Sequence, residues 1–211
     1  MIQVRDVLTV KFGKIDQAVE LFTKPSIPAP QFNASVRPVS ALTDISGNMY
    51  TLVNEFIAPN LGEYEKVRDQ QFTQPEFGKW FQQFQLFIEG GRREYYSIEG
   101  DYTPWSQPGR IVVREAYRAY KWQIRTAVSL MQRYGALLVD RGVGQNPHVL
   151  SDLAGSMFQA IIEIETESMS AWEEKRRALY RDTDFQVWFV QLQNAVESGS
   201  HEFYRVEYTG R

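Results

Sequence analysis

The chain has 211 residues, no cysteine and a formal net charge of −3, from 23 basic and 26 acidic side chains. Without thiols it has no disulfide, no thiolate nucleophile and no sulfur-ligated metal. No Lys/Arg cluster indicates a nucleic-acid or membrane partner, and the N-terminal sequence lacks the segments of a signal peptide. With 43% hydrophobic residues, the composition predicts a folded, cytoplasmic protein.

In chain order, the first half begins with a polar–apolar alternation that predicts a strand over residues 2–12. A helix follows, with Ile15, Ala18, Val19 and Phe22 on one face. After a looser stretch that contains three prolines (Pro25, Pro28 and Pro30), strands are expected over 36–43 and 49–56. A helix capped by Asn60 then breaks near Pro75 and restarts, and a last strand covers 94–99.

The second half repeats this order. Residues 42–99 align with 150–207 without a gap at an offset of 108, and 17 of the 58 pairs are identical. The sequence predicts strands over 111–121, 149–150, 157–164 and 202–207, and a first helix that ends near Gly135. Either Ser168 or Ser170 is a suitable N-cap for the next helix. A duplication of this length predicts two similar domains, residues 1–99 and 111–211, with residues 100–110 as the linker.

The order strand–helix–strand–strand–helix–strand is that of a ferredoxin-like unit, an α+β fold with helices on one face of its sheet. The other face is bare, and two such faces can pack on each other. The chain resembles a fused pair of dimeric α/β-barrel domains, with a leaning towards the NIPSNAP-like branch. The resemblance depends on Val4-Arg5-Asp6-x4-Lys11-x-Gly13-Lys14, on Glu55 and Glu163 in the third strands, and on Tyr64-Glu65-Lys66-Val67-Arg68 followed by Phe77-x2-Trp80.

What the resemblance implies about function is broad, because the superfamily includes cofactor-free and haem-degrading oxygenases, haem peroxidases, cyclases and proteins of no known activity. The strand pattern is more specific, since it predicts which side chains point between the two sheets. The charged and polar members of this set are the informative ones: Arg5, Lys11, Glu55, Arg114, Arg118, Tyr120, Gln159 and Glu163. Such charges, when buried, must pair with one another or bind a ligand.

Two interpretations of these interior charges remain open. In one, they form a salt-bridge network that joins the two halves, as the recurrence of Arg5 and Glu55 as Arg114 and Glu163 favours. In the other, they line a ligand site, with Glu163 as general base, Tyr120 as a second catalytic candidate, and a set of ligand-binding residues: Arg114, Arg118, Gln159 and Trp122.

The two histidines, His148 and His201, lie too far apart in sequence for a metal-ligand motif, so no metal site and no cofactor are expected. Both are expected in surface or loop positions. If haem binds, His201 is the expected ligand. Trp80, Phe81, Trp188 and Phe189 follow a helical stripe and are expected in the core. Trp105 in the linker and Trp122 at the start of a helix are the two candidates to line the mouth of a cavity.

Three functions follow from these observations. The first is a ligand-binding or interaction protein of the NIPSNAP-like kind without assigned catalysis. The second is a small-molecule enzyme, such as a cofactor-independent monooxygenase or a cyclase, with an asymmetric cavity between the sheets; Tyr117, Tyr120 and Trp122 would then contact an aromatic substrate. The third is a haem protein. The expected partner is a small molecule, and the chain is expected to be a monomeric pseudo-dimer or to dimerise further.

Overall fold

The computed structural model describes residues 1–23 and 35–210, so the expected proline-rich stretch lies largely outside the described residues. Repeat 1 contains β1 (Ile2–Val10), α1 (Ile15–Thr23), β2 (Arg37–Asp44), β3 (Thr51–Ala58), α2 (Leu61–Phe72), α3 (Pro75–Gln85) and β4 (Ile88–Ile98). Repeat 2 contains β5 (Ile111–Ala119), α4 (Ile124–Asp140), β6 (Gln145–Ala154), β7 (Gln159–Thr166), α5 (Met169–Leu179), α6 (Thr183–Gln193) and β8 (Val196–Thr209). The predicted order of elements is therefore confirmed in both repeats.

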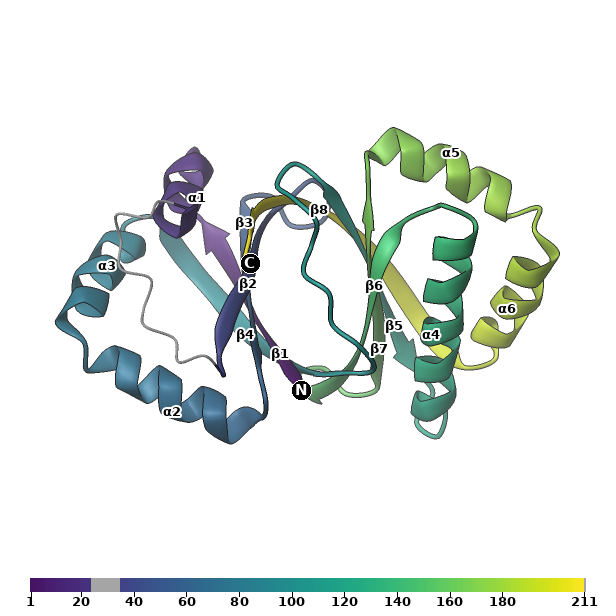
Figure 1. Cartoon of the computed structure of the whole chain (residues 1–211), viewed down its shortest axis with the longest axis horizontal. Helices are drawn as coiled ribbons and strands as arrows, with labels where there is room; N and C mark the ends of the chain where they lie inside the picture. Colours follow the sequence, from purple (N-terminus) through teal and green to yellow (C-terminus); the bar gives the residue numbers. More distant parts are fainter. Residues whose placement is uncertain (24–34, 211) are drawn as a thin grey trace.

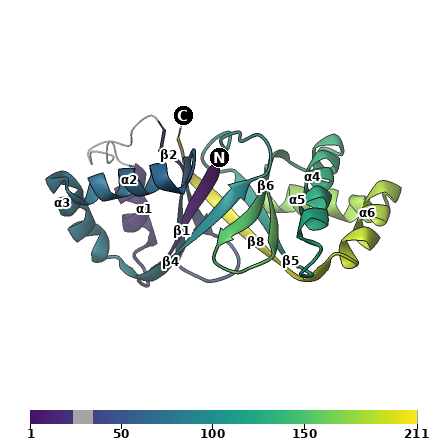
Figure 2. The ribbon, with the colours of Figure 1, turned by 90° about the horizontal axis from the view of Figure 1, so that it is seen from below.

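The eight strands of the described chain form one closed antiparallel barrel in the order β1-β3-β2-β8-β5-β7-β6-β4. Within each repeat the first and third strands are neighbours, as predicted. Hydrogen bonds between β2 and β8 and between β4 and β6 join the two repeats. Figure 1 shows helices α1–α3 outside one side of the barrel and α4–α6 outside the other, and Figure 2 shows the strands between these two helical layers.

Alternation along the strands separates a helix-facing side from a barrel interior. In β1, Val4 belongs to the core under the helices, whereas Val7 packs in the interior with Val53 of β3. In β7, Ile162 and Ile164 face the helices of repeat 2 and Ile161 faces the interior. The predicted α+β fold, two ferredoxin-like repeats closing an intrachain dimeric α/β barrel, is confirmed.

Side-chain caps begin the helices at the predicted positions. Asn60 Oδ1 accepts a hydrogen bond from Glu63 N at 2.9 Å, and Ser168 Oγ accepts one from Ala171 N at 3.1 Å. Ser168 is therefore the N-cap of α5, and Ser170 is not. Each such cap satisfies a backbone N–H that the helix itself leaves unpaired.

Several predicted boundaries were wrong. The second strand of repeat 2, expected over 149–150, is the ten-residue β6, and the last strands are much longer than expected. Helix α4 continues past Gly135 to Asp140. Gly135 stands where α4 meets β6, and a Cβ there would lie 2.9 Å from Pro147 Cβ. The glycine thus allows close packing and does not end the helix.

The aromatic stripe is less buried than predicted. Trp188 is 2% exposed, but Phe189 is 39% exposed and Trp80 and Phe81 of α3 are half-buried. In repeat 1, α3 makes an aromatic cluster on its own surface, where Trp80 stacks on Phe84 with ring centroids 5.0 Å apart. The stripe therefore predicted the correct helix face and overestimated its burial.

Candidate functional site in the barrel interior

The centre of the barrel holds a pseudo-symmetric set of charges. In repeat 1, Arg5 Nε lies 3.4 Å from Glu55 Oε1, and in repeat 2 Arg114 Nη1 pairs with Glu163 Oε1. All four side chains are at most 4% exposed. Adjacent strands position each pair, because Arg5 faces Glu55 in the β1–β3 register and Arg114 faces Glu163 in the β5–β7 register. The interior network predicted from the recurrence of these residues is present.

Each arginine also contacts the other repeat. The Arg5 guanidinium lies 5.0 Å from the ring centroid of Tyr204 on β8, and that of Arg114 lies 5.1 Å from the centroid of Tyr96 on β4. Equivalent side chains therefore meet across the interface between the repeats. By this criterion the symmetric part of the interior stabilises the barrel, since a structural contact is needed in both repeats.

The two carboxylates differ in charge state. Burial and the nearby charge of Glu163 raise the pKa of Glu55 to about 7, against the opposing effect of Arg5. Burial would also raise the pKa of Glu163, but the charges of Arg114 and Arg5 outweigh it and hold that pKa below its ordinary value. Two like charges in one buried space favour a single ionised carboxylate, here Glu163.

The repeats diverge at the residue beside each carboxylate. In repeat 1, Ser40 Oγ donates a hydrogen bond to Glu55 Oε2. The aligned residue of repeat 2 is His148, which is fully buried and lies opposite Glu163 in the β6–β7 register. The expectation of a surface or loop position for His148 was therefore wrong. The longer β6 is the reason, because it carries this residue into the barrel wall.

The linker between β4 and β5, residues 99–110, is a strap that crosses the barrel (Figure 1). His148 contacts two of its side chains: its ring stacks on Tyr102 with centroids 4.5 Å apart, and the ring of Trp105 lies tilted against it at 4.1 Å. Trp105 is 2% exposed, so it fills the interior and does not stand at a cavity mouth as expected.

The strap also determines the tautomer of His148. The Nε2 atom lies 2.6 Å from the carbonyl oxygen of Thr103, which can only accept a hydrogen bond, so Nε2 carries the proton. Burial lowers the pKa of His148, which keeps the imidazole neutral. Its Nδ1 atom is then an unprotonated acceptor, and it makes no hydrogen bond within the described chain. His148 is thus a buried neutral base whose orientation the backbone of the strap holds.

Polar atoms without a hydrogen bond gather around this point. Among the described residues, all the buried side-chain polar atoms of this kind belong to residues of the barrel interior and the strap: Gln3, Arg5, Glu55, Tyr102, Trp105, His148 and Glu163. A buried polar atom without a partner costs about 1–3 kcal/mol, so native proteins satisfy nearly all of them. The interior therefore has the hydrogen-bonding capacity for a small polar molecule.

The residues proposed from the sequence do not form one site. Arg114 and Glu163 lie together in the interior, and Gln159 is half-buried where its backbone N–H donates to Asp152 at 2.7 Å. Arg118 and Tyr120, which were expected in the interior, are exposed instead: Arg118 pairs with Glu197 on the surface and Tyr120 is 44% exposed. Trp122 is 82% exposed. The first strand of repeat 2 leaves the barrel at Ala119, which is why its last side chains reach solvent.

His201 belongs to a different cluster, on the helix-facing side of β5. Its Nε2 atom lies 3.1 Å from Glu115 Oε2, and the same carboxylate accepts hydrogen bonds from Tyr117 and Tyr134. Burial would raise the pKa of Glu115, but these hydrogen bonds and the charge of Arg176 lower it. Nε2 of His201, which would have to bind the iron if His201 were a haem ligand, is therefore already paired with Glu115. The difference between the repeats at these positions is visible in the alignment: where repeat 2 pairs Glu115 with His201, repeat 1 pairs the shorter Asp6 with Arg93.

Among the described side chains, no group of three or more His, Asp or Glu is arranged to hold a metal ion. No helix in the described ranges is long and apolar enough to cross a membrane.

A closed barrel built from two ferredoxin-like repeats, with helices outside and charges within, is the fold of a dimeric α/β barrel, formed here within one chain. Solved structures that match nearly all of it include an anthrone oxidase-like protein, with a TM-score of 0.73 and 15% identity over 99% of this chain and 92% of the other. A putative monooxygenase from Fusobacterium nucleatum matches with a TM-score of 0.70 and 8% identity over 98% of this chain and 92% of its own. A putative monooxygenase from Lactobacillus acidophilus matches with a TM-score of 0.68 and 7% identity over 98% of this chain and 94% of its own.

At these identities the likeness concerns the fold alone. The structure of a NIPSNAP domain protein from Burkholderia xenovorans matches half of the chain. The match covers 50% of this chain and 100% of that protein, with 11% identity and a TM-score of 0.43. No protein-family model and no curated protein matches the sequence.

Proposed function

We propose that this protein binds a small polar molecule inside the barrel, beside His148, and that binding is its function without an assigned reaction. The observation that carries this proposal is the set of buried polar atoms in the barrel interior and the strap that make no hydrogen bond within the described chain. Their combined desolvation cost would be large, and a ligand that hydrogen-bonds to several of them would remove it.

The pattern of donors and acceptors restricts the ligand. Trp105 Nε1 and Arg5 Nη2 can only donate hydrogen bonds, whereas His148 Nδ1 and the ionised Glu163 Oε2 accept them. A fitting molecule therefore carries both a hydroxyl or N–H group and a carbonyl or similar acceptor. Repeat 1 has no equivalent acceptor pair, because Ser40 already donates to Glu55. The binding position is thus expected in repeat 2.

The test is native mass spectrometry of freshly purified protein, with an absorbance spectrum from 300 to 700 nm. The wild type is expected to carry extra mass that is lost on denaturation. His148→Ser, which installs the residue of repeat 1, is expected to lose that mass, because Ser can donate to Glu163 and the Nδ1 acceptor is gone. His201→Ser is the matched control and should retain the mass.

A wild-type protein with no extra mass, and with no thermal stabilisation by any member of a panel of small hydroxylated and amide-containing molecules, would contradict the proposal. Equal loss of bound mass in both histidine variants would also contradict it. A Soret band that disappears in His201→Ser would replace this proposal with the haem alternative.

A cofactor-independent oxygenase is a second candidate, and the neutral base His148 between two aromatic rings favours it. The name of one full-length structural match, an anthrone oxidase-like protein, suggests the substrate to try. In such a reaction a base removes a proton from carbon, the carbanion gives its electrons to O2, and anthrone plus O2 yields anthraquinone plus water. Here His148 Nδ1 would accept that proton.

Oxygen uptake with anthrone as the probe tests this candidate. The wild type is expected to consume one O2 for each anthraquinone formed, faster than buffer, and His148→Gln should lose most of this rate because an amide cannot accept the proton. A rate equal to that of buffer, or an unchanged rate in His148→Gln, would eliminate His148 as an oxygenase base while leaving the binding proposal intact.

A further inference from the structure

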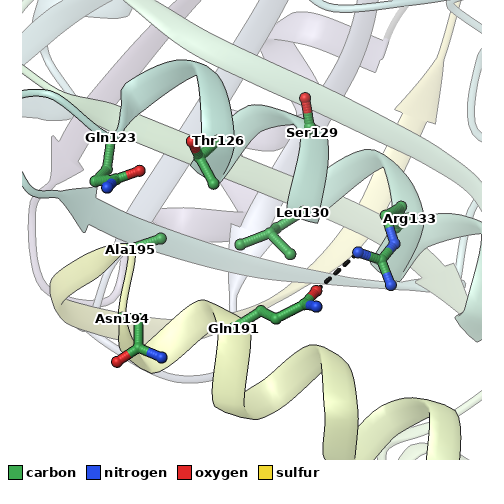
Figure 3. A pocket seen from close by; sticks show the side chains of 8 residues that line it. All are labelled: Gln123, Thr126, Ser129, Leu130, Arg133, Gln191, Asn194 and Ala195. Carbon is green, nitrogen blue, oxygen red and sulfur yellow. Dashed lines mark hydrogen bonds between the residues drawn. The ribbon is translucent and has the colours of Figure 1, made fainter.

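A second candidate binding site lies on the outer surface of repeat 2, away from the barrel interior. A pocket of about 340 Å³ lies between α4 and α6, within the size range of small-ligand sites. Figure 3 shows the side chains that line it, which come from α4, from α6 and from the residues next to their ends: Gln123, Thr126, Ser129, Leu130, Arg133, Gln191, Asn194 and Ala195. Ser129 lies at its edge, with the hydroxyl directed away from α6.

The base of the pocket is rigid. Leu130 is 3% exposed and belongs to the core under the helices, and its carbonyl oxygen accepts a hydrogen bond from Trp188 Nε1 of α6 at 2.8 Å. This bond fixes the spacing of the two helices. Repeat 1 has the equivalent bond, from Trp80 Nε1 to the carbonyl oxygen of Leu21 at 3.3 Å. The helix pairs of the two repeats are therefore held in the same way.

The side chains that fill the space differ between the repeats. Ala195, which lines the pocket, aligns with Phe87, and Phe87 packs against the core of repeat 1. Asn194 aligns with Leu86. Repeat 2 thus has a methyl group and an amide where repeat 1 has two large apolar side chains. Leu86 is 65% exposed, so the exchange of Phe87 for Ala195 is the one that removes a packed side chain at this position.

Its chemistry is that of a site for an anion. Arg133 Nη1 donates to Gln191 Oε1 at 2.8 Å across one end of the pocket (Figure 3), which holds the guanidinium in place and leaves its other N–H groups available. Among the described residues that line the pocket, none is acidic. At the position of Ser129, repeat 1 carries Glu20, so repeat 2 lacks a carboxylate that would repel an anion.

The remaining polar groups extend from Arg133 along α4. Ser129, Thr126 and Gln123 follow it on the same face, at intervals of three to four residues. At 1.5 Å per residue this row is about 15 Å long. Hydroxyl and amide groups in such a row can hydrogen-bond to the oxygens of a short hydroxylated chain.

We propose that the pocket between α4 and α6 binds a small organic anion, with its carboxylate or phosphate group at Arg133 and its hydroxyl or carbonyl oxygens along Ser129, Thr126 and Gln123. This site is independent of the barrel interior.

The test is an NMR titration of the amide and Arg side-chain N–H signals with three probes: citrate, inorganic phosphate and glucose. Citrate or phosphate is expected to saturate shifts in α4 and α6, including the Arg133 Nε–H signal. Arg133→Gln should weaken that binding about 10- to 100-fold, the effect of losing a charge-assisted hydrogen bond. Ala195→Phe, which restores the residue of repeat 1, should also weaken it.

Arg125→Gln is the matched control, because Arg125 lies on α4, is exposed and does not line the pocket. It should leave binding unchanged. Saturation by citrate alone would identify a carboxylate ligand, and saturation by phosphate alone a phosphate ligand. The proposal fails if neither anion saturates, if Arg125→Gln weakens binding as much as Arg133→Gln, if the shifts map to the barrel interior, or if glucose binds equally well to the wild type and Arg133→Gln.

Discussion

Glu55 and Glu163 show how one residue type in equivalent positions acquires two charge states. Each faces an arginine of its own repeat, but Glu55 also accepts a hydrogen bond from Ser40 while Glu163 stands beside His148 and close to both arginines. Burial and the charge of Glu163 raise the pKa of Glu55 against the lowering effects of Arg5 and Ser40, whereas Arg114 and Arg5 hold the pKa of Glu163 down. The polar neighbours of the two carboxylates differ by a single exchange of Ser for His. The binding proposal depends on the same exchange, because it leaves two acceptors without donors.

The raised pKa of Glu55 predicts a specific pH dependence. Since the folded protein holds this proton up to pH about 7 and the unfolded chain releases it near 4.5, the protonated carboxyl stabilises the fold below pH 4.5. That contribution is lost as pH rises from 4.5 through 7. Glu55→Gln, which mimics the protonated form, should therefore gain stability relative to the wild type over this window, by up to about 3 kcal/mol.

Urea unfolding at pH 4.5 and pH 8 measures this difference. Glu94→Gln is the control, because burial would raise the pKa of Glu94 but Arg5 and Arg114 lower it to about 2. Its stabilising effect is present above pH 4.5 and is lost only as pH falls towards 2, so its difference from the wild type should not change between pH 4.5 and 8. A Glu55→Gln difference that is also constant would disprove the assigned charge state.

At the scale of elements, the strap places two aromatic side chains beside His148 in repeat 2. The strap is held by Glu165 of β7, which accepts hydrogen bonds from Ser106 N at 2.7 Å and from Arg110 Nε at 2.8 Å. It places Tyr102 and Trp105 around His148. Glu165 thus adds two side-chain contacts to the backbone hydrogen bonds that hold the two ends of the strap, from Glu99 N to Val149 O and from Gly109 N to Val206 O.

Glu165→Ala should loosen the strap without unfolding the barrel. Losing charge-assisted hydrogen bonds to Ser106 and Arg110 is expected to increase hydrogen exchange of the amides in residues 101–110 at least tenfold. Exchange at β1 and β3, in the other repeat, should stay the same. An equal increase in both regions would show that Glu165 stabilises the whole fold and does not hold the strap specifically.

Two helix glycines predict opposite effects of the same substitution. Gly135→Ala in α4 places a Cβ 2.9 Å from Pro147, so it should destabilise the protein by about 1–3 kcal/mol despite the better helix propensity of alanine. Gly78 in α3 has no atom within 4 Å of such a Cβ, so Gly78→Ala should stabilise by about 0.5–1 kcal/mol. Thermal unfolding of the two variants compares them directly, and a loss of stability in both would contradict the packing argument.

At the scale of the whole molecule, the two repeats share one sheet and one interior. Strand pairs β2–β8 and β4–β6 cross between them, and so do the contacts of Arg5 with Tyr204 and of Arg114 with Tyr96. A break in either repeat exposes buried charges of the other. The molecule should therefore unfold as one cooperative unit.

Native-state hydrogen exchange tests this cooperativity. The slowest amides of β1 and β3 should exchange with the same free energy as those of β5 and β7, and both should fall equally in Tyr96→Leu, since Tyr96 contacts Arg114 of the other repeat. Tyr204→Leu is the symmetric control and should behave alike. A fall confined to the repeat that carries the substitution would show that the repeats unfold separately.

The sequence by itself determined the duplication, the order of elements, the helix-facing side of the first and third strands of each repeat, and the presence of Arg5, Arg114, Glu55 and Glu163 between the sheets. These properties follow from local periodicity and from the repetition of whole segments, and both can be read from the sequence without knowledge of how the side chains pack. The boundaries were less predictable. Gly135 has the local pattern of a helix end, yet the close approach of Pro147 is its actual reason.

Only the tertiary structure decided which residues meet. His148 looked like a loop residue because β6 is polar at its start, and Trp105 looked like a linker residue because prolines and glycines surround it. Both enter the interior, since closing the barrel creates a buried space that the strap must cross. The pocket between α4 and α6 was likewise not predictable, because it depends on the distance between two helices that a bond from Trp188 to Leu130 sets. Long-range contacts of this kind depend on the global geometry of the fold and leave no periodic signal in the chain.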